Sequence, residues 1–561
     1  MYILGIWDGH DSGACIIEDG IVKVAINEER LTRKKLDIGF PYNAIKACLN
    51  YLNLKITDIE VIACCGTQLT RMIGRAMPST DREFYNFRRR LIKKPRFEKR
   101  RRLLKYKLAD SNPGFGKKIA EYQLNKRLKR MGFRNYKLFV VDHHLAHASS
   151  AAFCSGFKKS LCITLDGVGD GLSGSVSIFK DGEFEVLSKI PARDSLGILY
   201  EQVTTLSGFR ELEDEGKIMC LADYSYPIED SKNPMLDFYQ VEGMTIKSKY
   251  SNARKFTELE KILWNTPREK FAYMAQKTLE KKMLELFRNS VNETGIKNVC
   301  WAGGVASNIK ANRIVRLNSG LKDWFVFPHM GDGGLAIGAA LYVSSIVAKT
   351  KTRKIDNVYF GPEFSDEEIE NELKSQRLKY EYRKDVSKVA AELICKGNYL
   401  FWFQGRMELG PRALGNRSII AAANSEEIKT RLNLEVKKRE WFQPFCPSLL
   451  ERDARIIFED YDGKPDKFMT MGFVVRKKFY KDAQSAVHID RSARPQMVGS
   501  ENKKYSNLIN HTRKKGVKVI LNTSFNIHGQ PIVFSPKDAI ETMLKTKTKH
   551  MILGNYYVGL K

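Results

Sequence analysis

Residues 161–190 read LCITLDGVGDGLSGSVSIFKDGEFEVLSKI, and this segment carries the clearest fold signal in the chain. Apolar runs rich in Ile, Val, Leu and Phe are separated by turns that carry glycine. Asp181-Gly182 is a dipeptide favoured in two-residue hairpin loops. The pattern therefore predicts a β-meander, in which successive antiparallel strands are joined by tight turns.

The N-terminus has the same plan in the runs YILGIWD, GACIIEDG and IVKVAINEE. Asp8-Gly9 stands where Asp166-Gly167 stands in the later copy, and Asp19-Gly20 corresponds to Asp181-Gly182. A plan that recurs within one chain indicates two similar halves. We predict that residues 1 to about 350 contain both.

Helices and strands are expected after each meander. In the second half they are a helix over 271–292, the strand NVCWAGG, a helix over 305–317, the strand DWFVFP and a helix opened by GDGG. Two meanders, each followed by helices and with acidic turns facing one another, are the plan of the actin-like ATPase (ASKHA) superfamily, in which a nucleotide binds between the halves. The fold class predicted for 1–350 is thus a duplicated actin-like α/β domain.

A second α/β domain is expected over 351–561. The polar stretch AKTKTRKIDNVYFGPEF is typical of a linker, and Ser365 with Glu368 forms a capping box that begins a helix. The runs YLFWFQG, RSIIAAA, KFMTMGFVVR and KVILNTSFN are expected strands.

The charge is strongly positive and unevenly placed. The chain has a formal net charge of +29, and residues 88–137 contain 20 Lys or Arg against three Asp or Glu. This insertion, which spans about 80–137, is either a surface for an anionic partner such as RNA or an acidic substrate, or a solvated helical segment. It has no base-reading motif.

Cysteine spacing and hydropathy indicate a cytoplasmic protein. No pair of the ten cysteines has C-x-x-C spacing, so they are expected to be reduced thiols rather than a disulfide or zinc framework. The first residues do not have the pattern of a signal peptide, and no apolar run has the length of a membrane span.

The stretch VDHHLAHASSAAF holds three of the nine histidines of the chain. His143 and His147 are four residues apart, so on a helix they share one face and can bind one metal ion, whereas His144 faces elsewhere. Asp166 and Asp332 end apolar strands beside glycines and could complete the ligand set. Two imidazoles with carboxylates suit iron(II) or another divalent ion. Ordinary half-buried histidines remain the alternative.

Two glycine-rich stretches could bind phosphate groups. WAGGVASN follows a strand and opens a helix, where backbone N–H groups favour an anion, although a tight turn explains it equally well. In the second domain QGRMELGPRALGNRSI gathers arginines around glycines, and Arg412, Lys437, Arg494, Asn522 and Ser524 could converge on phosphoryl oxygens.

Eight ordered motifs resemble the O-carbamoyltransferases that modify nodulation factors and antibiotics such as tobramycin, cephamycin and novobiocin. The likeness covers nearly the whole chain apart from the basic insertion. The motifs are GHDSGACIIEDGIVKVAINEERLTRKK, VDHHLAHASSAAF, EGKIMCLA, AGGVASN, GDGGLAIGAA, GRMELGPRALGNRSI, VKKREWFQPF and LNTSFN.

The resemblance implies a YrdC-like C-terminal domain that forms carbamoyl-adenylate and pyrophosphate from carbamoyl phosphate and ATP with Mg²⁺. It implies that the actin-like domain then moves the carbamoyl group to a hydroxyl of a small acceptor beside a bound iron(II). The implied site residues are His10 as catalytic base; His143, His147, Asp166 and Asp332 as metal ligands; Gly303, Gly304 and Asn308 for the nucleotide; and Arg412, Lys437 and Ser524 for carbamoyl phosphate. We also predict Gly331 and Gly333 for the nucleotide, and Arg494 and Asn522 for carbamoyl phosphate.

One position departs from the family pattern. Gln443 stands where the family has arginine in an Arg-Pro-Phe motif, and Lys438 or Arg439 could compensate for the missing cation. Two other functions stay open at this point: an enzyme of tRNA threonylcarbamoyladenosine formation, and a non-catalytic nucleic-acid-binding protein.

Overall fold

The computed structural model describes residues 1–91, 98–109 and 116–560, which form two compact units. The first unit comprises Met1–Glu28 and Leu36–Ile355, and the second comprises Glu29–Lys35 and Asp356–Lys561. The domain limits of 1–350 and 351–561 stay our proposal for the functional modules. None of the described helices is long and apolar enough to cross a membrane.

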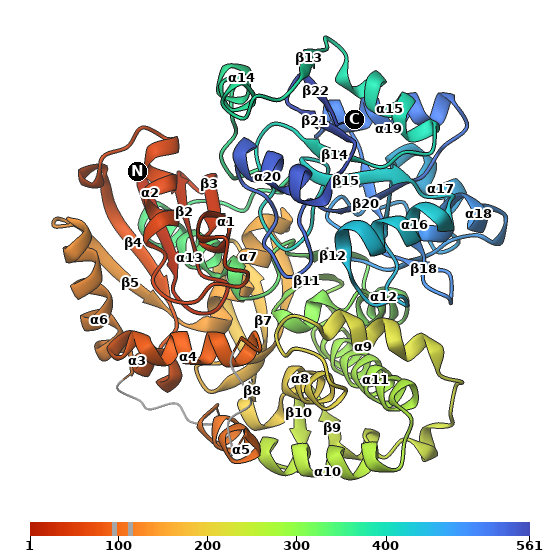
Figure 1. Cartoon of the computed structure of the whole chain (residues 1–561). Coiled ribbons are helices and arrows are strands. Elements are labelled where there is room, and N and C mark those ends of the chain that lie inside the picture. The colour runs from red at the N-terminus through yellow and green to blue at the C-terminus, as the bar shows by residue number, and fades with distance from the viewer. Residues whose placement is uncertain (92–97, 110–115, 561) are drawn as a thin grey trace. The chain divides into compact units, whose positions relative to one another are not determined.

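The first unit contains two five-stranded sheets of identical topology (Figure 1), as predicted. In each sheet three antiparallel strands form the meander and two parallel strands extend it. The strands of the first sheet, in spatial order, are β3 (Ile21–Asn27), β2 (Gly13–Glu18), β1 (Tyr2–Trp7), β4 (Ile59–Cys65) and β5 (Lys137–Val141). Those of the second are β8 (Glu183–Pro191), β7 (Leu172–Lys180), β6 (Lys159–Gly169), β11 (Asn298–Ala302) and β12 (Asp323–Val326).

A type I′ hairpin requires positive φ at both central residues, and Asp-Gly is a dipeptide that can adopt it. Asp19 and Gly20 have φ of 49° and 78°, and Asp181 and Gly182 have φ of 50° and 97°. The duplication predicted from these dipeptides is therefore confirmed in the backbone of both turns.

Two central helices bring the halves of this unit together. Helix α13 (Leu335–Ala348) packs on β1 and β4, while α7 (His143–Ser155) packs on β6 and β11, and the two helices contact each other. A Cβ on Gly338 would lie 1.9 Å from the carbonyl oxygen of Ala146, so glycine is needed for this close approach. The remaining long helices are α2 (Tyr42–Tyr51), α8 (Leu196–Leu206), α10 (Asn252–Trp264), α11 (Arg268–Thr294) and α12 (Ile309–Asn318).

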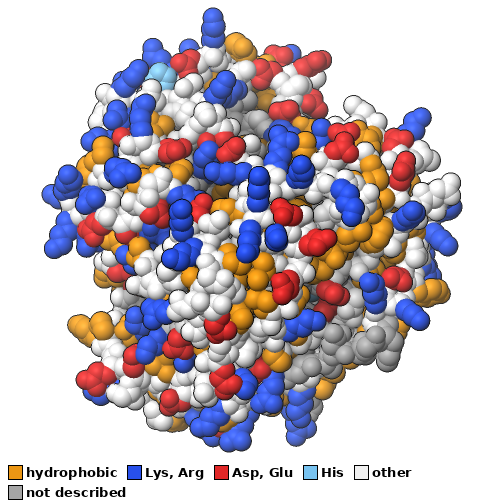
Figure 2. Space-filling model, turned by 180° about the vertical axis from the view of Figure 1, so that it is seen from behind, with side chains coloured by type: hydrophobic (Ala, Val, Ile, Leu, Met, Phe, Trp, Pro, Cys, Tyr) orange, Lys and Arg blue, Asp and Glu red, His pale blue; other side chains and the backbone are white. Residues whose placement is uncertain are grey.

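The basic insertion forms helices, and several of its cations are paired with acidic side chains. Arg89 binds Glu213, Arg102 binds Glu211, and the Lys105 ammonium lies 2.8 Å from Glu201. Figure 2 shows Lys and Arg spread over the visible face among acidic side chains. Residues 92–97 and 110–115 of the insertion lie outside the described residues. Its helices are α4 (Pro78–Arg88), α5 (Glu98–Ala109) and α6 (Gly116–Met131), and α3 (Leu69–Ala76) lies just before it.

The second unit is built on one mixed eight-stranded sheet, the separate α/β unit that was predicted. In spatial order its strands are β13 (Tyr380–Tyr382), β22 (Tyr556–Gly559), β21 (His550–Leu553), β14 (Leu400–Phe403), β15 (Arg417–Ala422), β20 (Ile520–Ser524), β16 (Cys446–Leu450) and β19 (Gln496–Val498). Its helices of ten residues or more are α14 (Asp366–Ser375), α15 (Val386–Cys395), α19 (Lys503–Lys514) and α20 (Pro536–Thr546). The capping box of Ser365 and Glu368 is confirmed at the start of α14.

A short segment from the N-terminal region, Glu29–Lys35, belongs to this second unit. The Arg30 guanidinium donates to the carbonyl of Gly410 at 2.8 Å. Arg33 donates to the carbonyls of Pro531 and Ile532 at 3.1 and 2.6 Å. No pattern in the sequence indicated that this segment belongs to the second unit.

Candidate active site

Four predicted metal ligands converge in the first unit. His143 and His147 lie on α7, Asp166 lies in β6, and Asp332 lies in the 3₁₀ turn η7 (Asp332–Gly334) just before α13. One potential ligand atom from each lies within 4.8 Å of the others. The His143 Nε2 atom is 3.5 Å from oxygens of both Asp166 and Asp332, and His147 Nε2 is 3.5 Å from Asp332.

The chemistry of these four residues fits a divalent metal ion. All four are buried, with at most 7% of each residue exposed. Nε2 of His143 and of His147 has no hydrogen-bond partner among the described residues, although buried polar atoms normally have one. Separations of 3.5 Å are long for hydrogen bonds, but they suit lone pairs directed at one shared point. Imidazole and carboxylate donors together suit several divalent ions, including iron(II).

The two carboxyl groups of this cluster have opposite pKa shifts. Burial raises the pKa of Asp332 to about 8, and the nearby Asp166 charge adds to this effect. Burial acts in the same direction on Asp166, but the neighbouring His143 imidazole, the charges of both histidines and the Gly304 N–H outweigh it and lower the pKa of Asp166. Two carboxylates held this close repel each other, and a bound cation relieves that repulsion.

His10 lies next to the cluster. It follows β1, and its Nε2 is 3.2 Å from Asp332. Its side chain is 31% exposed, so a substrate can reach the ring. Partial burial, followed by the charge of Arg88, lowers the pKa of His10 to about 3, so the imidazole is neutral.

Asp170 is a residue of this site that the sequence analysis missed. Its carboxylate accepts a hydrogen bond from the backbone N–H of His143 at 2.9 Å and another from that of Thr67 at 2.6 Å. It thereby caps α7, whose own N-cap residue Asp142 makes no side-chain cap. The glycines on either side of Asp170 were the only signal for this role, because its partners are distant in sequence.

Asp8, the counterpart of Asp166, is not part of the cluster. Arg75 donates to both of its oxygens at 2.8 and 2.9 Å, and Arg71 donates to its backbone carbonyl at 2.6 Å. Burial disfavours the Asp8 carboxylate, but the charges of Arg75 and Arg71 and the hydrogen bond from Arg75 outweigh burial and lower its pKa to about 2. The carboxylate is thus fully engaged by guanidinium groups.

The glycines predicted to bind nucleotide lie in turns beside the cluster, and most are required by packing. A Cβ on Gly303, which has a φ of 101°, would lie 2.1 Å from the carbonyl oxygen of Leu165. One on Gly333 would lie 2.2 Å from His329. Only at Gly331 would a Cβ meet no atom within 4 Å, so that position alone among these three is open to a ligand.

Two further residues of the predicted nucleotide site have structural roles in this conformation. The N–H of Gly304 donates to Asp166 at 2.6 Å and so ties its turn to the cluster. Asn308 is the N-cap of α12, where its side chain accepts from the N–H of Ala311 at 3.0 Å. Neither contact tests the binding of a nucleotide, which stays a prediction.

Two of the cations predicted to bind carbamoyl phosphate, Arg412 and Arg494, lie near Cys446 in the second unit. Arg494 donates to the Cys446 sulfur at 3.1 Å. Burial raises the pKa of this thiol, but the charges of Arg494, Arg412 and Arg439 outweigh burial and lower it. Asn522 is the backbone partner of Cys446 across β16 and β20, so three of the five predicted residues lie near one point.

The other two residues, Lys437 and Ser524, contact each other. The Lys437 ammonium donates to Ser524 Oγ at 3.1 Å and to the Asn526 side-chain oxygen at 2.7 Å. Burial, followed by the charges of Arg439 and Lys35, lowers the pKa of Lys437. Asn526, which also accepts from Ser524, was missed by the sequence analysis.

Lys438 and Arg439, the two cations that could compensate for the missing family arginine, differ in their surroundings. Lys438 is exposed. Arg439 donates to the carbonyl of Pro444 at 2.8 Å, and its guanidinium carbon lies 4.0 Å from the centre of the Phe445 ring. Arg439 is therefore the cation beside the Gln443 turn.

Comparison with known proteins identifies the family. Residues 2–341 match the family model of the carbamoyltransferase N-terminus, and residues 391–559 match that of the carbamoyltransferase C-terminus. Nodulation protein NolNO of Sinorhizobium fredii is 35% identical over 98% of this chain and 79% of its own length. An uncharacterised protein of Methanocaldococcus jannaschii, MJ1051, is 33% identical over 99% of both chains.

The chain belongs to the carbamoyltransferase family, and it is an enzyme that transfers carbamoyl groups. The hypothesis of a non-catalytic nucleic-acid-binding protein is therefore wrong. Among solved structures, T. kodakarensis HypF matches 63% of this chain and 48% of its own at 14% identity with a TM-score of 0.38, a similarity too low to support a conclusion.

Proposed function

We propose that this enzyme is an ATP-dependent O-carbamoyltransferase with two partial reactions. In the first, carbamoyl phosphate, ATP and one water give carbamoyl-adenylate, phosphate and pyrophosphate in the second unit. In the second reaction a hydroxyl oxygen of a small acceptor attacks the carbamoyl carbon, and AMP leaves. The observation that carries the proposal is the convergence of His143, His147, Asp166 and Asp332 beside His10.

In the first unit, His10 is proposed to take the proton of the acceptor hydroxyl at Nε2. The ring is partly exposed and lies beside the proposed ligand Asp332, which orients it. A divalent ion held by the four ligands, proposed to be iron(II), would polarise the carbamoyl carbonyl. Asp170 holds α7 in place and so fixes both histidines.

In the second unit, Arg412, Arg439 and Arg494 are proposed to neutralise the phosphate of carbamoyl phosphate. Guanidinium groups bind phosphoryl oxygens in bidentate fashion, and carbamoyl phosphate is a dianion. The Lys437 ammonium donates its hydrogen bonds to Ser524 and Asn526. It is therefore proposed to act mainly through its charge and by holding the Ser524–Asn526 loop in position. The tRNA-modification alternative draws little support from the basic insertion, because Arg89, Arg102 and Lys105 are paired with glutamates.

The test is pyrophosphate release from ATP and Mg²⁺ that depends on carbamoyl phosphate. We expect release by the wild type and a fall of at least about tenfold in Lys437→Met, as is usual when a charged contact is lost. Lys438→Gln is the matched control, because this neighbouring lysine is exposed. If the wild type releases no pyrophosphate with or without an acceptor extract, the proposal is wrong.

A further inference from the structure

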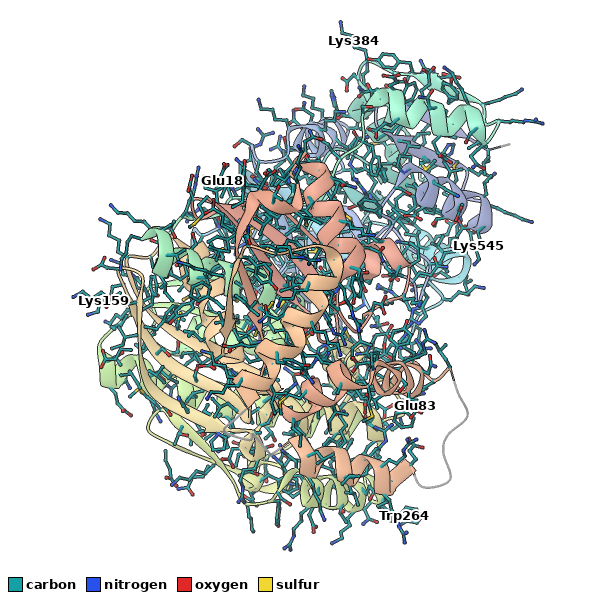
Figure 3. The ribbon with its side chains drawn as sticks, turned by 90° about the vertical axis from the view of Figure 1, so that its left-hand side faces the viewer. Glu18, Glu83, Lys159, Trp264, Lys384 and Lys545 are labelled. Carbon is teal, nitrogen blue, oxygen red and sulfur yellow. The ribbon has the colours of Figure 1, made fainter. Side chains whose placement is uncertain are left out.

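Arg88, in the last turn of α4, is a buried cation that the proposed mechanism does not use. It is 3% exposed, and its one hydrogen bond among the described residues runs from Nη2 to the carbonyl oxygen of Leu36 at 2.8 Å. Its Nε and Nη1 are also buried and have no hydrogen-bond partner there. By contrast, Glu83 on the same helix lies on the surface with 71% of its side chain exposed (Figure 3).

The guanidinium lies close to the catalytic corner of the first unit. Leu36 belongs to a loop in which Ile38 forms a β-bridge with His10. The N–H of Gly39 in this loop donates to the carbonyl of Gly9 at 3.4 Å. Arg88 and His10 therefore contact the same short loop, residues 36–39.

No carboxylate of the described residues forms an ion pair with Arg88. The acidic groups that act on it from nearby, Glu211 and Glu213, are bound to other cations of the insertion, namely Arg102, Lys105 and Arg89. A buried charge is costly unless it is paired, and buried donors are normally satisfied. Two N–H groups of one guanidinium match the two oxygens of a carboxylate or a phosphoryl group.

We propose that Arg88 binds an acidic group of the acceptor, so that the substrates of this enzyme are hydroxylated acids bearing a carboxylate or phosphate. This inference rests on the proposed function. Binding the acid at Arg88 would hold the acceptor with a hydroxyl toward His10. The basic insertion, which supplies Arg88, would then serve acceptor recognition rather than RNA binding.

The experiment uses the full-length, metal-loaded enzyme with ATP, Mg²⁺ and carbamoyl phosphate labelled in the carbamoyl carbon. A metabolite extract of the native host is separated by ion exchange into acidic, neutral and basic pools. We expect the wild type to place the label in acidic-pool compounds. Arg88→Gln should lower this transfer by at least about tenfold, as loss of a charged hydrogen bond does, while Arg88→Lys retains part of it.

The control variant is Arg130→Gln, which removes an exposed cation of the same insertion and should transfer label like the wild type. Metal content and thermal melting show whether Arg88→Gln is folded. If it is not folded, the transfer of label by Arg88→Lys is compared with that of the wild type instead. Label confined to the neutral or basic pool, label in no pool, or equal transfer by Arg88→Gln and Arg130→Gln overturns the inference. A loss by Arg88→Gln that is equal for acidic and neutral acceptors also overturns it, because Arg88 would then hold the adenylate phosphate.

Pyrophosphate release distinguishes this failure from failure of the proposed function. Release by the wild type without label in the acidic pool refutes the acidic acceptor alone. Absence of release refutes the carbamoyl-adenylate reaction, and the acceptor assignment falls with it.

Discussion

The two halves of the first unit have the same strands in the same order, yet their equivalent aspartates differ in surroundings. Asp8 is engaged by Arg75 and Arg71, whereas Asp166 faces His143 and a second carboxyl group. The backbone is thus duplicated while the electrostatics are not. Arg71 and Arg75 come from α3, which follows β4 in the first half, so elements added after the meander decide what each aspartate can bind.

Exchanging each aspartate for asparagine tests this comparison most strongly. We expect Asp166→Asn to lose bound metal, with affinity falling more than about 100-fold, because loss of an outer-shell partner alone costs 10- to 100-fold. Asp8→Asn should retain the metal. Elemental analysis of the purified variants measures both. Equal metal content in the two variants would contradict the distinction between the halves.

The stability of the protein, in contrast to its metal content, should depend on Asp8 in the first half. Asp8→Asn leaves the buried Arg75 without its carboxylate, so we expect the free energy of unfolding to fall by about 3 kcal/mol, as is typical of a broken buried ion pair. Urea denaturation followed by fluorescence measures this change. Asp19→Asn, in an exposed hairpin turn, serves as the control. A loss no larger than that of the control would mean that Arg75 finds another partner.

The pH dependence of stability tests whether the Asp8 carboxylate is held ionised by its arginine partners. The pKa of Asp8 is lowered from its ordinary 3.8 to about 2, so its stabilisation is complete above about pH 4 and is lost as the pH falls from 4 toward 2. This lowering of the pKa, by a little under two units, corresponds to about 2.5 kcal/mol. In urea denaturation, the stability difference between wild type and Asp8→Asn should be constant from pH 5 to 7 and shrink below pH 4. A difference that grows on acidification would show that the carboxylate is not held ionised.

Substitution of His144 is expected to have the smallest effect on stability. It tests which histidines of α7 belong to the proposed metal-ligand set. Its Nδ1 lies 2.9 Å from Thr164 Oγ1, so it is placed away from the predicted ligands. His144→Gln should cost about 1 kcal/mol of stability, the usual worth of one hydrogen bond, and keep the metal. His147→Gln, one turn further along α7, should lose it. Metal loss in both variants would mean that His144 belongs to the ligand set.

Local signals in the sequence predicted most of this fold. Asp-Gly hairpins and the Ser365 capping box depend on neighbouring residues, so they can be recognised without tertiary structure. The run KFMTMGFVVR was predicted wrongly as a full strand, since only Phe473–Val474 is one. The Asp466 carboxylate accepts from the N–H groups of Phe468, Thr470 and Met471, which replaces the ladder hydrogen bonds of a strand.

The candidate site was predicted only as far as residue chemistry allowed. The spacing of His143 and His147 indicated one helical face, and the structure places the two aspartates beside them. Asp170 and Arg88 could not be found in this way, because each acts on a segment distant in sequence. Arg88 also begins a run of three arginines, and no feature of the sequence marks it as buried while others of the insertion are exposed.

The placement of Glu29–Lys35 in the second unit constrains how this enzyme can be made or dissected. A fragment that starts near Asp356 would lack a piece of its own structure, so cutting the gene at the linker cannot yield an intact second unit. During synthesis the first part of that unit leaves the ribosome more than 300 residues ahead of the rest. The two units therefore cannot be separated by a single cut in the sequence.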